Sequence, residues 1–206
     1  MVDVDGTTVA FDVAAQGLLA GSPHAAHIHF GAQARHECPT ASEDTDGNGH
    51  LNTSEGAPAY GPVAVSLTTE GDTSPESVLA VDRYATGPDI DYSRSDVQVS
   101  EELANAIVAG QGVAVVHGVD YNGNGMYDGD AGMSDLDPSL PAEATDPAIC
   151  GVLAASQMSG MPQGGVDTGA GSTDGTENIG LIGAGGVALL GGAALAVRRR
   201  RLADDS

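Results

Sequence analysis

The stretch HAAHIHFGAQARHEC, residues 24–38, holds four of the six histidines of the chain within thirteen residues. His27 and His29 are two positions apart, and in an extended segment that spacing places both imidazoles on one face of a sheet. Imidazole is the commonest metal-donating side chain, so two on one strand provide half of a tetrahedral site. The alternative is an exposed polar strand on which histidines cluster by chance. The number of histidines favours the metal site.

The chain has 206 residues and is strongly acidic, with 29 Asp and Glu against 7 Lys and Arg and a formal net charge of −22. Four of the arginines are consecutive, at 198–201. Nucleic acids and anionic lipids need a basic surface, so the acidic folded part is expected to bind neither. The 30 glycines and 3% aromatic residues predict many turns and a core of aliphatic side chains.

Short segments of alternating apolar residues predict β-strands. Val9, Phe11 and Val13 alternate with small or polar residues after an Asp5-Gly6 turn, which is the pattern of a half-buried strand. Further strand candidates are residues 62–69, 77–81, 97–99 and 113–119.

One helix is predicted, over residues 100–110. Ser100 is a suitable N-cap, two glutamates suit the positive end of the helix, and Gly110 suits its C-terminus. Short strands, frequent turns and one short helix predict an all-β, antiparallel Greek-key sandwich or barrel for residues 1–155.

The chain contains two cysteines, Cys38 and Cys150. An isolated pair so far apart in sequence fits one long-range disulfide in an oxidising compartment. Two unrelated buried thiols are the alternative. The surface location that the C-terminal sequence indicates favours the disulfide.

The composition changes after residue 155. Residues 156–179 are rich in Gly, Ser and Thr and predict a flexible linker. Residues 180–197 carry no charge and would span about 27 Å as a transmembrane helix. The arginines of the basic tail, residues 198–206, place that tail in the cytoplasm. The arrangement resembles the C-terminal anchor of Gram-positive surface proteins, which implies the extracellular face of the membrane or the cell wall. Because no signal peptide precedes the first strand, we expect the natural chain to start upstream.

DTDGNGHLNTSE, residues 44–55, fits the twelve-residue calcium loop of EF-hand proteins, with Gly49 at the sharp turn. The expected oxygen donors are Asp44, Asp46, Asn48, the carbonyl of His50, Asn52 and Glu55. No flanking helices are evident, so we expect an isolated loop. A polar glycine-rich loop without a metal is the alternative.

A second segment, DYNGNGMYD at residues 120–128, repeats the start of this pattern. Its expected donors are Asp120, Asn122, Asn124 and Asp128. Ala131 stands where the loop needs a glutamate, which leaves both calcium binding and a metal-free loop open. Calcium in either loop would be structural, ordering the loop and neutralising acidic charge.

Three further motifs occur in a fixed order: GLLAGSPHAAHIHFG at residues 17–31, VAVVHGVD at 113–120 and AICGVL at 148–153. They resemble the copper/zinc superoxide dismutase family, which has an HGxHVH strand, a late VVH strand and an ACGVIG ending. Cys38 also follows His29 by nine residues, as in that family. The AHIH strand resembles chordin-repeat (CHRD-like) domains as well.

The resemblance implies roles for individual residues. His27, His29 and His117 would be copper ligands, and His24 would be a structural histidine that ties loops together.

The resemblance also pairs Cys38 with Cys150 in a disulfide that pins the first loop of the site to the last strand. The family's histidine that bridges copper and zinc has no clear match. His36 and His50 are the candidates for a fourth copper donor.

Two features of the family are missing from this sequence. The segment that would bind zinc is replaced by the loop 44–55, so no zinc site is expected. The arginine that attracts superoxide beside the copper is replaced by TDPAI at residues 145–149. An acidic surface without that arginine would repel a superoxide anion.

Three hypotheses follow. The first is a surface-anchored copper-only domain that dismutates superoxide at His27, His29 and His117. The second is a non-enzymatic, calcium-stabilised CHRD-like binding or adhesion module whose histidines only form hydrogen bonds. The third is copper sequestration or delivery at the cell surface. Superoxide or copper is the expected small partner, and the membrane is reached through the C-terminal helix.

Overall fold

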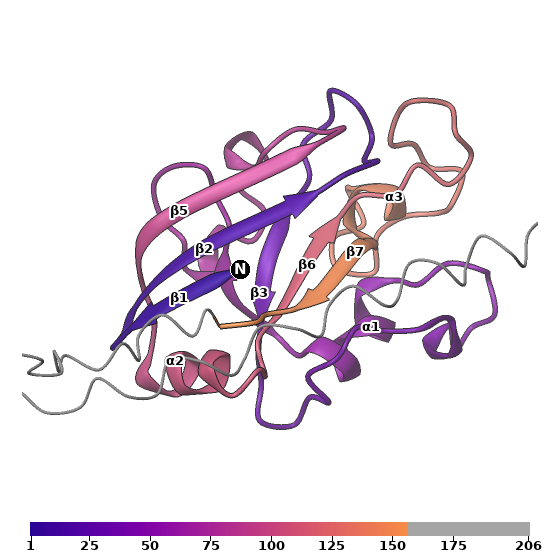
Figure 1. Ribbon diagram of the computed structural model, residues 1–206. Helices are drawn as coiled ribbons and strands as arrows, with labels where there is room; N and C mark the ends of the chain where they lie inside the picture. The colour runs from indigo at the N-terminus through magenta and orange to yellow at the C-terminus, as the bar shows by residue number, and fades with distance from the viewer. Residues whose placement is uncertain (156–206) are drawn as a thin grey trace, which may run out of the picture. The chain divides into compact units, whose positions relative to one another are not determined.

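The computed structural model describes residues 1–155, whose strands form two antiparallel sheets (Figure 1). The order β1-β2-β5 joins β1 (Val2–Asp5), β2 (Thr8–Ala15) and β5 (Ile90–Gln98). The order β4-β3-β6-β7 joins β4 (Val63–Ser66), β3 (Ala26–His29), β6 (Val113–His117) and β7 (Pro147–Val152). This mostly β architecture with two antiparallel sheets confirms the expected fold class at that level.

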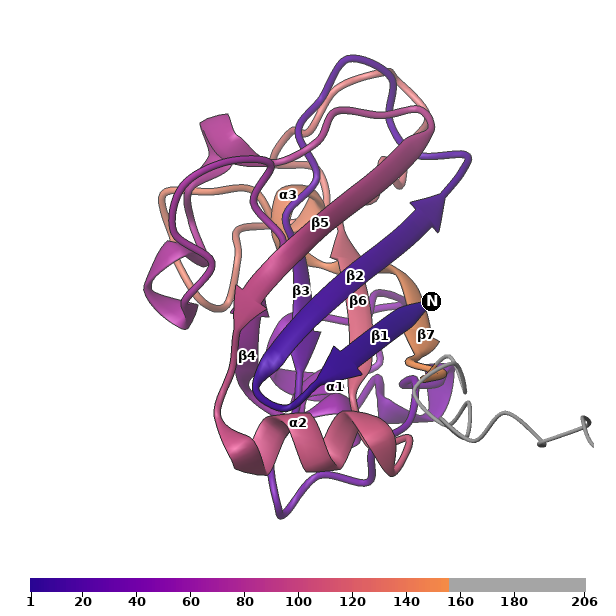
Figure 2. The ribbon, with the colours of Figure 1, turned by 60° about the vertical axis from the view of Figure 1, so that its left-hand side comes forward.

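The core lies between the two sheets, whose layers cross in Figure 2. Val9 and Phe11 of β2 are fully buried there, as their alternation predicts, and Ile28 of β3 meets them from the other sheet. Each such side chain contributes about 1.5–3 kcal/mol when removed from water. The sheet that carries the histidine strand is therefore fixed by an ordinary aliphatic core on one of its faces.

Helices and 3₁₀ turns connect the strands of the described residues. The helices are α1 (Thr53–Tyr60), α2 (Glu101–Val108) and α3 (Ala142–Thr145), and the 3₁₀ turns are Ala41–Glu43, Pro75–Ser77 and Val81–Arg83. The sequence predicts α2 correctly, including the Ser100 cap that accepts a hydrogen bond from the Leu103 amide. The expectation of a single helix is wrong, because α1 and α3 are also present.

α1 begins inside the predicted calcium loop, which corrects the expectation of an isolated loop. The Asn52 side chain accepts a hydrogen bond from the Glu55 amide, and the Glu55 carboxylate accepts one from the Asn52 amide. This reciprocal capping starts the helix although Gly56 and Pro58 both have low helix propensity. Those two residues hide the helix from a search for apolar periodicity.

The predicted strand at residues 77–81 is also wrong. The segment lies in and between two 3₁₀ turns, because the Asp72 carboxylate accepts hydrogen bonds from the hydroxyls of Ser74 and Ser77. These side-chain bonds give the backbone an alternative to a sheet ladder.

β5 is longer than the short strand that the sequence predicts at residues 97–99. Its pairing with β2 shifts register between Arg94 and Val97, and Asp96 has a positive φ of 61°. Such a bulge breaks the two-residue period from which a strand is recognised. The bulge therefore explains why the sequence pattern indicates only the end of β5 as a strand.

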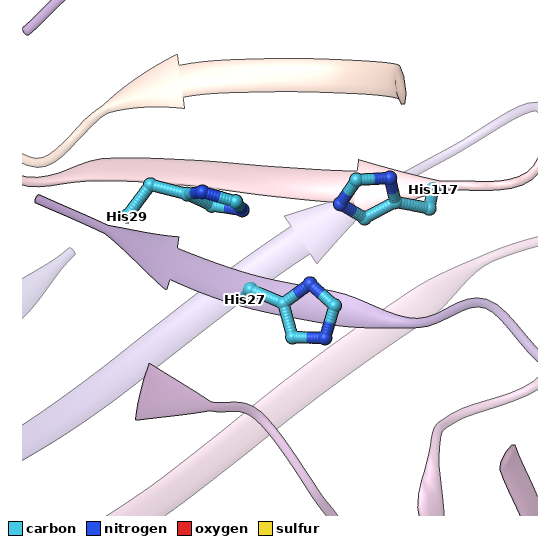
Figure 3. A group of neighbouring side chains, drawn as sticks. All are labelled: His27, His29 and His117. Carbon is cyan, nitrogen blue, oxygen red and sulfur yellow. The ribbon is translucent and has the colours of Figure 1, made fainter. Parts of the chain in front are cut away.

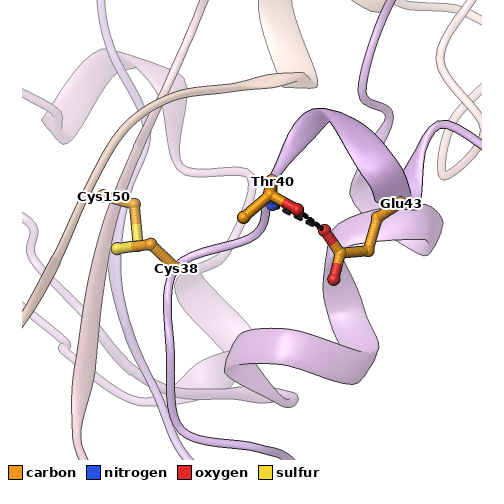
Figure 4. The surroundings of a disulfide bond; sticks show 4 residues. All are labelled: Cys38, Thr40, Glu43 and Cys150. Carbon is orange, nitrogen blue, oxygen red and sulfur yellow. Dashed lines mark hydrogen bonds between the residues drawn. A yellow bond between two sulfur atoms is a disulfide. The ribbon is translucent and has the colours of Figure 1, made fainter.

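The predicted disulfide joins Cys38 to Cys150, with a Cα–Cα distance of 5.6 Å (Figure 4). It ties the segment after β3 to β7. Just beyond Cys38, the amide and the hydroxyl of Thr40 both donate to the Glu43 carboxylate and close the first 3₁₀ turn.

No helix within residues 1–155 is long and apolar enough to cross a membrane. The predicted linker, transmembrane helix and basic tail, residues 156–179, 180–197 and 198–206, lie outside the described residues.

Candidate metal centre

Three histidines share the face of the four-stranded sheet that points away from the core (Figure 3). In the antiparallel pairing of β3 with β6, His27 lies opposite Val115 and His29 opposite Val113. Because side chains alternate between faces, His117 at the end of β6 lies on the same side as the pair on β3. The placement that a shared metal site requires is therefore present.

The three side chains also converge. One ring nitrogen from each of His27, His29 and His117 lies within 4.8 Å of the other two. Nitrogens that are each about 2.0–2.1 Å from one ion are separated by about 3.4–4.2 Å, so small ring movements would complete the geometry. All three residues are buried, with relative exposures of 3%, 2% and 4%.

The rear nitrogen of each ring is held by a hydrogen bond. His29 Nδ1 lies 2.8 Å from the Gly61 carbonyl oxygen, and His117 Nδ1 lies 2.6 Å from the Thr145 carbonyl oxygen. A carbonyl only accepts, so each of these nitrogens carries the ring proton of the neutral imidazole. Second-shell bonds of this kind orient the ring of a metal-binding histidine.

His27 is oriented in the same way from the opposite ring position. Its Nε2 lies 3.0 Å from the Tyr84 hydroxyl and 3.3 Å from the Val78 carbonyl oxygen. The Tyr84 hydroxyl donates to the Ser77 carbonyl at 2.9 Å, so its oxygen is left to accept from His27.

The front nitrogens have no hydrogen-bond partner. They are Nδ1 of His27, Nε2 of His29 and Nε2 of His117, and all three atoms are buried. A buried polar atom without a partner carries a desolvation cost of about 1–3 kcal/mol. Three such lone pairs on one face of the sheet form a donor set that a soft or borderline divalent metal would satisfy.

The same burial keeps the imidazoles neutral. It lowers the pKa of His29 to about 3 and of His117 to about 4, against the ordinary value of 6.5. Burial, followed by the charges of the two neighbouring histidines, also lowers the pKa of His27 well below 6.5. A metal ligand must be unprotonated, so these rings are ready to bind far below neutral pH.

The remaining histidines have other positions. His24 is fully buried and contacts the carbonyl oxygens of His117, at 2.8 Å, and Leu19, at 3.2 Å, in keeping with a structural role. His36 stacks on the Phe30 ring and lies 3.0 Å from the Gly31 carbonyl oxygen.

His50 packs edge-on against Tyr121 at a ring-centroid distance of 4.1 Å. Neither His36 nor His50 joins the group of three, so the structure brings no fourth histidine to the site.

A cavity of about 120 Å³ opens onto the three histidines. Most of the other residues that line it are aliphatic or proline, and Leu79, Val81 and Leu136 at its edge are 47%, 45% and 55% exposed. The site is therefore reached from the surface through an apolar pocket.

The first predicted calcium loop gathers its acidic residues. One carboxylate oxygen from each of Asp44, Asp46 and Glu55 lies within 4.8 Å of the other two. The Asp44 carboxylate also accepts hydrogen bonds from the amides of Gly47 and Gly49, at 2.7 and 2.9 Å.

The second loop has the same turn. Asp120 accepts from the amides of Gly123 and Gly125, each at 2.8 Å. Among the described residues its acidic side chains do not gather into a comparable group. The side-chain amides of Asn122 and Asn124 instead donate to the Asp128 carboxylate.

One buried carboxyl group was not apparent from the sequence. Asp146 is 1% exposed; its Oδ2 accepts from the Tyr121 hydroxyl at 3.0 Å, and its Oδ1 has no partner. Burial, reinforced by nearby Asp135 and Glu55, raises its pKa to about 7. Asp146 directly follows Thr145, whose carbonyl oxygen accepts the hydrogen bond from His117 Nδ1. The buried carboxyl group is therefore one residue away from a support of the histidine cluster. A lone Asp in a polar loop gives no sequence signal of this environment.

Residues 167–201 match the family model of the LPXTG cell wall anchor motif. The match supports a cell-surface protein that is held at the cell wall through its C-terminal segment. No curated protein and no solved structure matches the chain.

Proposed function

We propose that this is a cell-surface copper-binding protein whose ion is held by His27, His29 and His117. The observation that carries the proposal is the set of three buried front nitrogens without hydrogen-bond partners. If the histidines served only as hydrogen-bonding groups, the burial of three ring nitrogens without partners on one face of the sheet would have no explanation. Copper is preferred because it binds imidazole sites most tightly among the first-row divalent metals.

The residues around the site act as a rigid holder. The Gly61 and Thr145 carbonyls and the Tyr84 hydroxyl hold the rear nitrogens of the three rings, which leaves the front nitrogens available to an ion. The Thr53 hydroxyl at the start of α1 donates to the same Thr145 oxygen at 2.9 Å, which ties the helix to the His117 support. Bound copper would supply one-electron chemistry, because it exchanges between two oxidation states.

Superoxide dismutation is a second candidate, favoured by the pocket that gives a small molecule access to the histidines. The three arginines of the described residues are engaged elsewhere, however. Arg83 and Arg94 contact the carbonyls of the 68–72 segment, and Arg35 pairs with two glutamates. No Lys or Arg side chain of residues 1–155 lines the pocket to attract an anion. We therefore place copper retention first.

We also propose a structural calcium ion in the loop 44–55. Its three gathered carboxylates support this proposal, since calcium prefers such oxygen donors. The loop 120–128 stays a weaker candidate of the same kind.

The central experiment measures copper binding to the full-length protein. After loading with equal amounts of copper and zinc and removal of free metal, we expect about one copper ion per chain. His29→Ala and His117→Gln should each lower the affinity at least about a hundredfold, because each removes one of three donors. His36→Ala is the matched control and should bind as wild type.

Unchanged copper affinity in both variants would refute the proposal, and preferential zinc loading would reassign the metal. Thermal unfolding of each variant identifies any that does not fold. Superoxide consumption by the loaded wild type then separates the two candidates, since tight copper without turnover supports retention alone.

A further inference from the structure

The side chains that line the pocket above the histidines add no formal charge to that of a bound metal ion. None of the lining residues is Asp, Glu, Lys or Arg. Such a lining offers no side chain of opposite charge to an incoming anion.

The two threonine hydroxyls that line the pocket are also occupied. The Thr53 hydroxyl donates to the Thr145 carbonyl, and the Thr145 hydroxyl donates to Ser134. A small anion would therefore lose its hydration shell and find at most the Tyr127 hydroxyl as a side-chain donor, which is costly.

The size of the pocket limits what it holds. A volume of about 120 Å³ equals roughly four water molecules, at about 30 Å³ each. It is well below the range of about 300–1,000 Å³ that is typical of sites for larger organic ligands. Cavities lined by aliphatic side chains bind apolar molecules such as xenon in preference to water.

We propose that the pocket selects small uncharged apolar molecules, of the size of dioxygen, over anions as ligands beside the three histidines. The metal-dependent part of this inference rests on the proposed copper site, whereas the apolar selectivity belongs to the pocket itself. The molecule that reaches the metal would thus differ in charge from superoxide.

The first test uses xenon as the probe, with the full-length protein in its metal-free and Cu(I)-loaded forms. We expect saturable chemical-shift changes at pocket residues such as Val78 and Leu140. Ala144→Leu adds carbon atoms inside the pocket and should abolish them. Ala148→Leu, at an exposed position outside the pocket lining, is the matched control and should leave them unchanged.

The second test uses azide as an anionic probe of the Cu(II)-loaded protein, followed by its charge-transfer absorption. We expect the azide affinity to be about fivefold to tenfold higher in Leu136→Lys than in the wild type, because the substitution brings a cation to the edge of a pocket that otherwise lacks one. Val108→Lys, on the exposed side of α2, is the control and should have no effect.

The outcomes separate the two proposals. Absence of xenon shifts in the wild type, or an azide affinity that Leu136→Lys does not raise, would overturn the selectivity proposal. Failure to bind copper would refute only the proposed function, because the xenon test in the metal-free protein still decides whether the pocket has the stated preference.

Discussion

The imidazole Nδ1 of His24 lies 2.8 Å from the backbone carbonyl oxygen of His117, across 93 residues of sequence. The loop before β3 is thereby attached to the end of β6, at the third histidine of the candidate metal centre. His24 thus acts on the candidate metal centre through the backbone, without belonging to the donor set.

His24→Ala should lower the free energy of unfolding by about 2–4 kcal/mol, since it leaves a cavity and an unpaired buried carbonyl. Urea unfolding measures the change. His36→Ala, at a partly exposed ring, should cost much less. Equal losses in the two variants would contradict the structural role of His24.

Tyr84→Phe should weaken copper binding about 10–100-fold, because His27 loses the nearer of the two acceptors that orient its ring. Competition with a copper chelator measures the affinity. Tyr92→Phe removes a comparable hydroxyl that bonds to Thr68 away from the site, so it should bind copper normally. A loss of the same size in both variants would mean that the hydroxyl at position 84 has no specific part in the centre.

The buried histidines should make the metal-free protein sensitive to acid. Their pKa values are lower in the folded than in the unfolded protein, so the unfolded chain binds more protons between about pH 6.5 and pH 4. Stability should therefore fall as the pH drops through that window, by up to about 1.4 kcal/mol per pH unit for each histidine. His117→Gln should reduce the slope of unfolding free energy against pH, and an unchanged slope would show that this residue is not the cause.

Asp146 should have the opposite effect. Its pKa is raised to about 7, so the folded state holds a proton that the unfolded state has released, and this stabilising contribution is lost as the pH rises toward 7. Asp146→Asn should therefore be more stable than the wild type at pH 8, with a smaller difference at pH 5. Unfolding in urea at the two values tests this. A variant that is less stable at pH 8 would show that the carboxylate is compensated by groups beyond Tyr121.

Calcium should raise the unfolding temperature of the full-length protein relative to a chelator-treated sample. Glu55→Gln should lower the calcium affinity at least about tenfold, because a bidentate carboxylate is lost while glutamine still caps α1. The rise in unfolding temperature with calcium should be correspondingly smaller. Glu76→Gln, at an exposed glutamate of another turn, is the control. An equal calcium response in the two variants would place the ion outside the loop 44–55.

The sequence was most informative where periodicity and spacing coincide. The two-residue spacing of His27 and His29 predicts their shared face, and the antiparallel register then brings His117 to it. The supports of the site could not be predicted in the same way, because the Gly61 and Thr145 carbonyls are backbone groups whose position depends on the whole fold. Tyr84 is the one support that acts through its side chain, but an isolated tyrosine in a loop is too common in sequences to indicate this role.

The disulfide between Cys38 and Cys150 bears on how the protein withstands proteolysis outside the cell. It closes a covalent ring that contains both acidic loops, 44–55 and 120–128, with their many exposed residues. A protease that cuts either loop would leave a nicked chain whose two pieces remain bonded. The strand pairing of β3 with β6 would still hold the three histidines together, so a single cleavage would not separate the residues of the candidate metal centre.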